Sequence, residues 1–238
     1  MRLNKLVSDS GRCSRREADR LIAERRVTVN GRFVELGAQV EADDEIRLDD
    51  EILRTSSQRR AKSKIYIAFN KPAGITCTTD QRVEGNIIDF IDHAERIFPI
   101  GRLDKDSEGL ILLTNDGDIV NQILRAENRH EKEYLVAVDK PITDAFLAGM
   151  ANGVRIHRSK TLPCRIMRTG KYTFRIILVQ GLNRQIRLMC AAFDYAVRGL
   201  QRQRIKNIRL DRLKLGGWRN LSPAELHGLL PTRQLDQP

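Results

Sequence analysis

The chain has 238 residues, and its 42 Lys and Arg outnumber its 31 Asp and Glu, which gives a formal net charge of +11. This surplus favours a polyanionic partner, nucleic acid first, although a generic basic protein would share it. No transmembrane helix is expected, since no apolar stretch of about 18 residues exists to span a bilayer. The start of the chain also lacks the apolar region of a signal peptide, so the expected location is the cytoplasm. The length predicts two unequal domains.

A helix followed by a hairpin is predicted near the N-terminus. Ser14 with Glu17 three residues later forms a capping-box pattern, and apolar residues at helical spacing follow it. Residues 27–29 then form a short β-rich run that ends at Asn30-Gly31, a strong hairpin-turn signal.

The same segment is strongly basic. Residues 1–32 hold nine basic and four acidic side chains. Arg15, Arg16 and Arg20 share the polar face of the predicted helix, and we expect them to contact RNA phosphates, with an ordinary solvated helix face as the alternative. The sequences RLNK at 2–5, CSRREA at 13–18 and VTVNG at 27–31 resemble the S4-like (alpha-L) RNA-binding domain.

A polar, charged stretch at residues 49–64 predicts a mobile linker. The expected domains are therefore 1–60, the S4-like domain with its linker, and 61–238.

The second domain mixes strands and helices. Strands are predicted at 65–69, 110–113, 133–138, 172–179 and 205–210, and helices at 118–125, 143–150, 184–193 and from the Ser222-Pro223-Ala224-Glu225 cap onward. Repeated hairpin signals favour an α+β fold on a mixed, largely antiparallel sheet flanked by helices. No dinucleotide-binding or Walker glycine motif is present, and the cysteines and histidines lack metal-ligand spacing. We expect no cofactor, no metal and no disulfide.

The segment GRLDKDSEGL at 101–110 is the best candidate for chemistry, because it places charges directly before a buried strand. In extended backbone Arg102 and Asp104 would share a face and Leu103 would point away. A carboxylate beside a guanidinium stays ionised, as a nucleophile or base must. The alternatives are a calcium loop, a plain surface turn, or a magnesium-binding acidic cluster of Asp104, Asp106 and Glu108.

This segment resembles the central motif of the pseudouridine synthase family that includes the ribosomal small- and large-subunit enzymes. Three further segments resemble the other family motifs in the same order: NKPAG at 70–74, HEKEYLV at 130–136 and GLNRQIRLM at 181–189. Leu188 departs from the family, which usually has a second basic residue there. With the S4-like domain, the resemblance covers the chain to about residue 230.

The resemblance implies isomerisation of a uridine, with Asp104 as catalytic aspartate and Arg187 as its ion-pair partner. Tyr134 matches the tyrosine that can stack on the flipped uracil, and Arg102 the residue that can fill the vacated stack. A core tyrosine and a phosphate clamp are the respective alternatives, and Arg187 could itself contact a phosphate.

The remaining candidate positions have supporting roles. Lys71 is expected to shape the site and bind substrate, Ile186 to form an apolar wall of the pocket, and Arg184 to bind RNA. The expected partner is structured RNA, with 23S rRNA first, a tRNA as a possible second substrate and 16S rRNA as the next alternative. A monomer is expected. The rival functions are a non-catalytic RNA-binding or ribosome-assembly protein and a metal-dependent phosphohydrolase.

Overall fold

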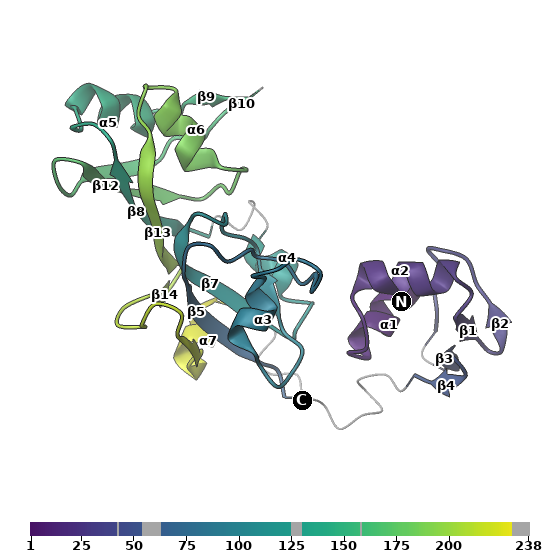
Figure 1. The fold of residues 1–238 in the computed structure, drawn as a ribbon. Helices are drawn as coiled ribbons and strands as arrows, with labels where there is room; N and C mark the ends of the chain where they lie inside the picture. Colours follow the sequence, from purple (N-terminus) through teal and green to yellow (C-terminus); the bar gives the residue numbers. More distant parts are fainter. Residues whose placement is uncertain (42, 54–62, 125–129, 158, 230–238) are drawn as a thin grey trace. The chain divides into compact units, whose positions relative to one another are not determined.

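The computed structural model describes residues 1–41, 43–53, 63–124, 130–157 and 159–229. The chain separates into two compact units, Met1–Lys64 and Ile65–Pro238 (Figure 1). The boundary expected between residues 60 and 61 lies outside the described residues. Among the described residues, no helix is both long and apolar enough to cross a membrane.

The N-terminal unit packs two helices, α1 (Leu3–Asp9) and α2 (Arg15–Ala23), against a small sheet. Its strands run in the order β2 (Arg32–Phe33), β1 (Val27–Val29), β3 (Ile46–Leu48), β4 (Glu51–Ile52). The predicted cap is confirmed, because the Glu17 amide donates to Ser14 Oγ at 3.1 Å. The predicted hairpin is also confirmed, since Asn30 and Gly31 take the left-handed conformation that such a turn requires.

The prediction that a linker starts at residue 49 is wrong. Glu51 and Ile52 form strand β4 beside β3, and Leu53 is buried in the core of the N-terminal unit. This short amphipathic segment follows a polar turn, so the local increase in charge concealed one more strand of the sheet.

The larger unit is built on a mixed, largely antiparallel sheet, as predicted. Its main path runs β11 (Arg165–Arg168), β12 (Thr173–Leu178), β8 (Lys132–Val138), β13 (Val197–Ile205), β7 (Glu108–Thr114), β5 (Tyr66–Lys71), β15 (Trp218–Asn220). Strand β14 (Ile208–Arg209) pairs with β13, and β6 (Phe98–Ile100) pairs with β7. Among the pairings of this sheet in the described residues, β13 with β7 is the parallel one.

Helices cover both faces of this sheet (Figure 1). Side chains that alternate along β5 and β7 enter two separate apolar clusters, one on each face. Three helices contribute to the first cluster: α3 (Ile87–Ile91), α5 (Asp144–Ala151) and α6 (Gln185–Ala191). Two contribute to the second: α4 (Val120–Leu124) and α7 (Pro223–Leu229). A small ribbon of β9 (Arg155–Ile156) and β10 (Ser159–Lys160) stands apart from the main sheet.

One predicted strand is misplaced. The sequence predicts a strand at 205–210, whereas the long strand β13 ends at Ile205 and the chain turns back through Lys206, whose φ is 51°. Strand β13 carries Arg198, Arg202 and Arg204, so its charges concealed the alternation of buried side chains. The four cysteines, Cys13, Cys77, Cys164 and Cys190, are free thiols.

Candidate active site

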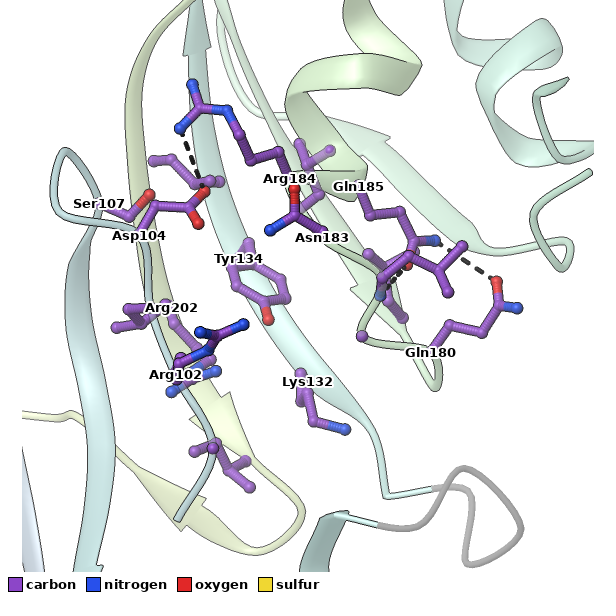
Figure 2. Close-up of a pocket in the computed structure, with 18 of the residues that line it drawn as sticks. Arg102, Asp104, Ser107, Lys132, Tyr134, Gln180, Asn183, Arg184, Gln185 and Arg202 are labelled. Carbon is purple, nitrogen blue, oxygen red and sulfur yellow. Dashed lines mark hydrogen bonds and ion pairs between the residues drawn. The ribbon is translucent and has the colours of Figure 1, made fainter. Parts of the chain in front are cut away.

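Asp104 lies in the loop that joins β6 to β7. Leu103 is 8% exposed and packs into the core, and its amide donates to Cys77 Sγ at 3.4 Å. Its neighbours Arg102 and Asp104 line the same cavity (Figure 2). Arg102 and Asp104 thus share the cavity as predicted, while Leu103 between them borders the cavity and anchors the loop to the core.

Lys71, at the end of β5, is completely buried and holds this loop in place. Its ammonium donates to the carbonyl oxygens of Ser107 at 2.7 Å, Pro72 at 2.8 Å and Lys105 at 3.4 Å. Burial lowers the pKa of this lysine, and the carbonyl oxygens offset part of that cost. The expectation that Lys71 contacts substrate is wrong, because its side chain has no exposed surface; it braces the loop from behind.

Gly109 explains how close two strands of the site can come. It pairs with Arg202 across the parallel β7–β13 contact, and a Cβ at Gly109 would lie 2.3 Å from the Arg202 carbonyl oxygen. Its φ of +101° also excludes most other residues. Gly109 thus allows β13 to approach β7, the strand that follows Asp104.

Tyr134 lies on β8, directly opposite Arg202 of β13. Side chains opposite each other in an antiparallel pair share a face, so both line the cavity. Tyr134 is 9% exposed and also belongs to the core cluster, so the alternative of a core tyrosine describes part of its surroundings. Figure 2 shows its ring between Asp104 and Lys132.

The predicted pair between Arg187 and Asp104 is not present. Arg184 Nη1 lies 3.7 Å from an Asp104 carboxylate oxygen, whereas Arg187 pairs with Asp106 at 3.2 Å. Arg187 also donates to the Asp106 and Val197 carbonyl oxygens, at 3.2 Å each, and to Ser107 Oγ at 3.4 Å. Arg187 thus connects α6 to both the loop and β13, and its side chain is mostly buried between them.

The backbone at the start of α6 explains why Arg184 rather than Arg187 pairs with Asp104. Arg184 is the N-cap residue in the left-handed conformation, with φ of 48°, and it is half exposed. Its side chain reaches back across the cavity toward Asp104 (Figure 2). Arg187 lies in the first turn of the helix and points toward the loop backbone. Ile186, between them, is 4% exposed and lines the cavity, as expected.

These side chains surround a cavity of about 490 Å³. Apolar walls come from both halves of the sheet, and the polar groups gather in two places. In Figure 2, Asp104 and Arg184 lie toward one end, and Arg102, Lys132 and Arg202 toward the other. The cavity therefore combines an acid toward one end, an aromatic ring in its wall and a cationic group of side chains toward the other end.

Two residues that line the cavity, Lys132 and Arg202, are not among those that the sequence assigned to the active site. Lys132 is two residues before Tyr134 on the same strand, so the alternation rule places it on the same face. Burial, with a smaller effect from Arg202, lowers the pKa of Lys132. Arg202 could be found only after β13 had been recognised as a strand, because its position depends on pairing with β7 and β8.

The acidic residues of the central segment do not form a metal site in the described part of the chain, where no group of three potential ligand side chains is found. Asp106, which a calcium or magnesium site would need, faces Arg184 at 3.5 Å and Arg187 at 3.2 Å. These guanidinium groups compete with a cation for the same carboxylate.

In the N-terminal unit, Arg15, Arg16 and Arg20 all lie exposed on α2. Arg20 is engaged with Glu17 and, at 3.7 Å, with Glu24. Arg15 and Arg16 have no carboxylate partner among the described residues, so their charges are available to an anionic ligand.

Residues 65–192 match the RNA pseudouridylate synthase family, and residues 1–46 match the S4 domain. This chain belongs to the RNA pseudouridylate synthase family. It is 52% identical over 226 residues to the dual-specificity RNA pseudouridine synthase RluF of Escherichia coli K12, covering 95% of this chain and 77% of that protein. It is 31% identical to the ribosomal small subunit pseudouridine synthase A of Haemophilus influenzae, covering 97% and 100%.

A crystal structure of a pseudouridylate synthase is similar to this synthase with a TM-score of 0.71 and 30% identity, over 97% of this chain and all of that one. The expected fold, an S4 domain followed by a pseudouridine synthase domain, is thereby confirmed. The synthase is an isomerase that acts on RNA, and this finding excludes the two rival functions, a non-catalytic RNA-binding protein and a phosphohydrolase.

Proposed function

We propose that this synthase converts a specific uridine of 23S rRNA to pseudouridine and also accepts a tRNA. The observation that carries the proposal is 52% identity, over 95% of the chain, to an enzyme named for dual specificity. The likeness to a small-subunit enzyme is weaker, at 31%, which makes 16S rRNA the second candidate. The chain acts as a monomer in this proposal, with its own S4 domain as the additional RNA-binding surface.

The cavity supports a base-flipping reaction. Asp104 and Tyr134 are recessed in a cavity that a stacked base in a helix could not enter, so the target nucleotide has to leave its stack at a cost of a few kcal/mol. The uracil then lies against the Tyr134 ring, where stacking contributes about 1–3 kcal/mol. Arg102, exposed beside the cavity, fills the vacated stack or holds a phosphate.

Asp104 acts on the ribose, either as nucleophile or as base. Its ion pair with Arg184 orients the carboxylate in the cavity. Arg187 has a positioning role, since it contacts the backbone and side chain of the loop that carries Asp104 rather than the acid itself.

The test compares Asp104→Asn with Asp106→Asn in cells that lack the gene. Asp106 is the matched control, because it lies two residues away and shares the Arg184 contact but does not line the cavity. Pseudouridine in ribosomal and transfer RNA is mapped with a carbodiimide reagent. We expect the missing sites to return with wild type and with Asp106→Asn, and to stay absent with Asp104→Asn.

Return of the modification with Asp104→Asn would remove this residue from the chemistry. Sites found only in 16S rRNA would overturn the proposed substrate while leaving the catalytic assignment intact.

A further inference from the structure

Arg202 has an unusual environment for an arginine. It is 4% exposed, and its Nε donates to the Leu110 carbonyl oxygen at 2.6 Å. Neither terminal nitrogen of its guanidinium has a hydrogen-bond partner among the described residues, and no carboxylate there pairs with it; Nη2 is fully buried. The nearby Arg204, in contrast, has counter-charges: its guanidinium nitrogens lie 2.9 Å from carboxylate oxygens of both Glu131 and Glu133.

A buried guanidinium without a counter-charge is costly, because it has lost its water without gaining an anion. The fold nevertheless fixes it firmly. Arg202 is opposite Tyr134 on β8 and opposite Gly109 on β7, so two neighbouring strands hold its backbone. Lys132 adds a second cation nearby, and its pKa is lowered partly by Arg202. Such a site suits a ligand that brings negative charge into the cavity.

We propose that Arg202 is a catalytic residue whose guanidinium donates to a carbonyl oxygen of the flipped uracil and stabilises the negative charge on the detached base. The proposal rests on the proposed roles of Asp104 and Tyr134. The cross-strand pairing explains the geometry: a uracil against the Tyr134 ring has its edge beside the side chain on the opposite strand.

The chemistry requires such a group at one step. When the bond from C1′ of the ribose to N1 of uracil breaks, the electron pair leaves with the ring and is shared with its carbonyl oxygens. The ring turns, the pair forms the bond from C5 to C1′, and the proton lost from C5 is balanced by one gained at N1. Nothing is oxidised or reduced. A fixed donor stabilises the intermediate charge more strongly than water would, because it does not have to reorient during the reaction.

The base fits this position better than a backbone phosphate. The cavity around Arg202 has apolar walls that include Leu112, Leu200 and Ile205. These walls suit a planar ring, whereas a phosphate is bound more readily at an exposed cation such as Arg102. A phosphate contact by Arg202 is therefore an alternative outcome of the test.

The experiment measures single-turnover rates with enzyme in excess over an RNA that carries either uridine or 5-fluorouridine at the target. The fluorine withdraws electrons and stabilises the detached base by itself. Conversion is followed as loss of the original nucleoside after digestion of the RNA. Arg202→Gln is compared with wild type and with Arg198→Gln, an exposed arginine on the same strand.

We expect Arg202→Gln to slow conversion of uridine on the order of 100-fold. The defect with 5-fluorouridine should be several-fold smaller, and Arg198→Gln should react at the wild-type rate with both. An equal loss with both substrates would assign Arg202 a structural role and overturn the proposal. Weaker RNA binding with an unchanged rate would show a phosphate contact and would also overturn it.

Arg202→Lys keeps the experiment decisive if Arg202→Gln does not fold. A lysine buried beside Lys132 should lose its proton within the accessible pH range, so its rate should fall as pH rises relative to wild type. A profile parallel to that of wild type would contradict the proposal. Activity of Asp104→Asn, in contrast, would overturn the proposed function and leave the comparison of the two nucleosides valid.

Discussion

Replacing Gly109 with Ala should destabilise the larger unit more than almost any other substitution that adds a single methyl group. The new Cβ would lie 2.3 Å from the Arg202 carbonyl oxygen and 2.6 Å from its nitrogen, both in the backbone. A φ of +101° adds strain of about 1–3 kcal/mol for a residue with a Cβ. Separating β7 from β13 weakens the pairing at two register positions, at about 1 kcal/mol for each hydrogen bond lost. We expect a total of about 3–5 kcal/mol, at the upper end of single substitutions.

Urea unfolding followed by tryptophan fluorescence measures this effect. Trp218 is the single tryptophan of the chain and lies on β15 of the same sheet. Gly117→Ala is the control, because its added Cβ meets no atom within 4 Å and its φ lies outside the left-handed region. That variant should stay within about 0.5 kcal/mol of wild type. A loss below about 1 kcal/mol in Gly109→Ala would refute the close approach of β7 and β13.

Two further predictions concern other parts of the chain. Arg219 donates to both carboxylate oxygens of Glu225 at 2.7 Å and holds its pKa at about 2, below the usual 4.5. Since the folded pKa is the lower one, Glu225 stabilises the fold above about pH 4.5 and this contribution disappears as pH falls toward 2. Glu225→Gln should therefore cost about 1 kcal/mol at pH 7, reduced by solvent screening, and progressively less as pH falls to about 2. An equal loss at both pH values would contradict the ion pair. Changing Arg15 and Arg16 together to Gln should reduce the slope of log affinity for RNA against log salt by about 2. Arg26→Gln is the control and should leave this slope nearly unchanged, because the Arg26 charge is already paired with Asp49. An unaltered slope in the double variant would remove α2 from the RNA interface.

Local signals in the sequence predicted the helix starts well. Ser14 caps α2 and Ser222 caps α7, and in both helices the amide of the Glu three residues later donates to the Ser hydroxyl. These contacts join residues close in sequence, so the residue types suffice to identify them. The first turn of α3 has a comparable cap at Asn86, which accepts from two amides, but a helix of five residues has too few apolar positions to show a period.

The ion pairs of the site could not be predicted in the same way. Arg184 and Arg187 are three residues apart, and the choice between them depends on the left-handed backbone at the N-cap of α6. A motif shows that an arginine and an aspartate belong together but not which arginine reaches the acid. The burial of Lys71 was equally hidden, because two of its three carbonyl partners, Lys105 and Ser107, come from another segment of the chain.

The position of the cavity follows from the topology of the sheet. In the described residues, β11, β12, β8 and β13 form one antiparallel group and β7, β5 and β15 form another, and the parallel contact of β13 with β7 joins them. Asp104 comes from the loop before β7, and Tyr134 and Arg202 come from β8 and β13, so the cavity lies where the two groups meet. Gly109 allows this junction to close. Asp104 on one side and Lys132 with Arg202 on the other therefore belong to different halves of the sheet, and their separation depends on the contact between β7 and β13.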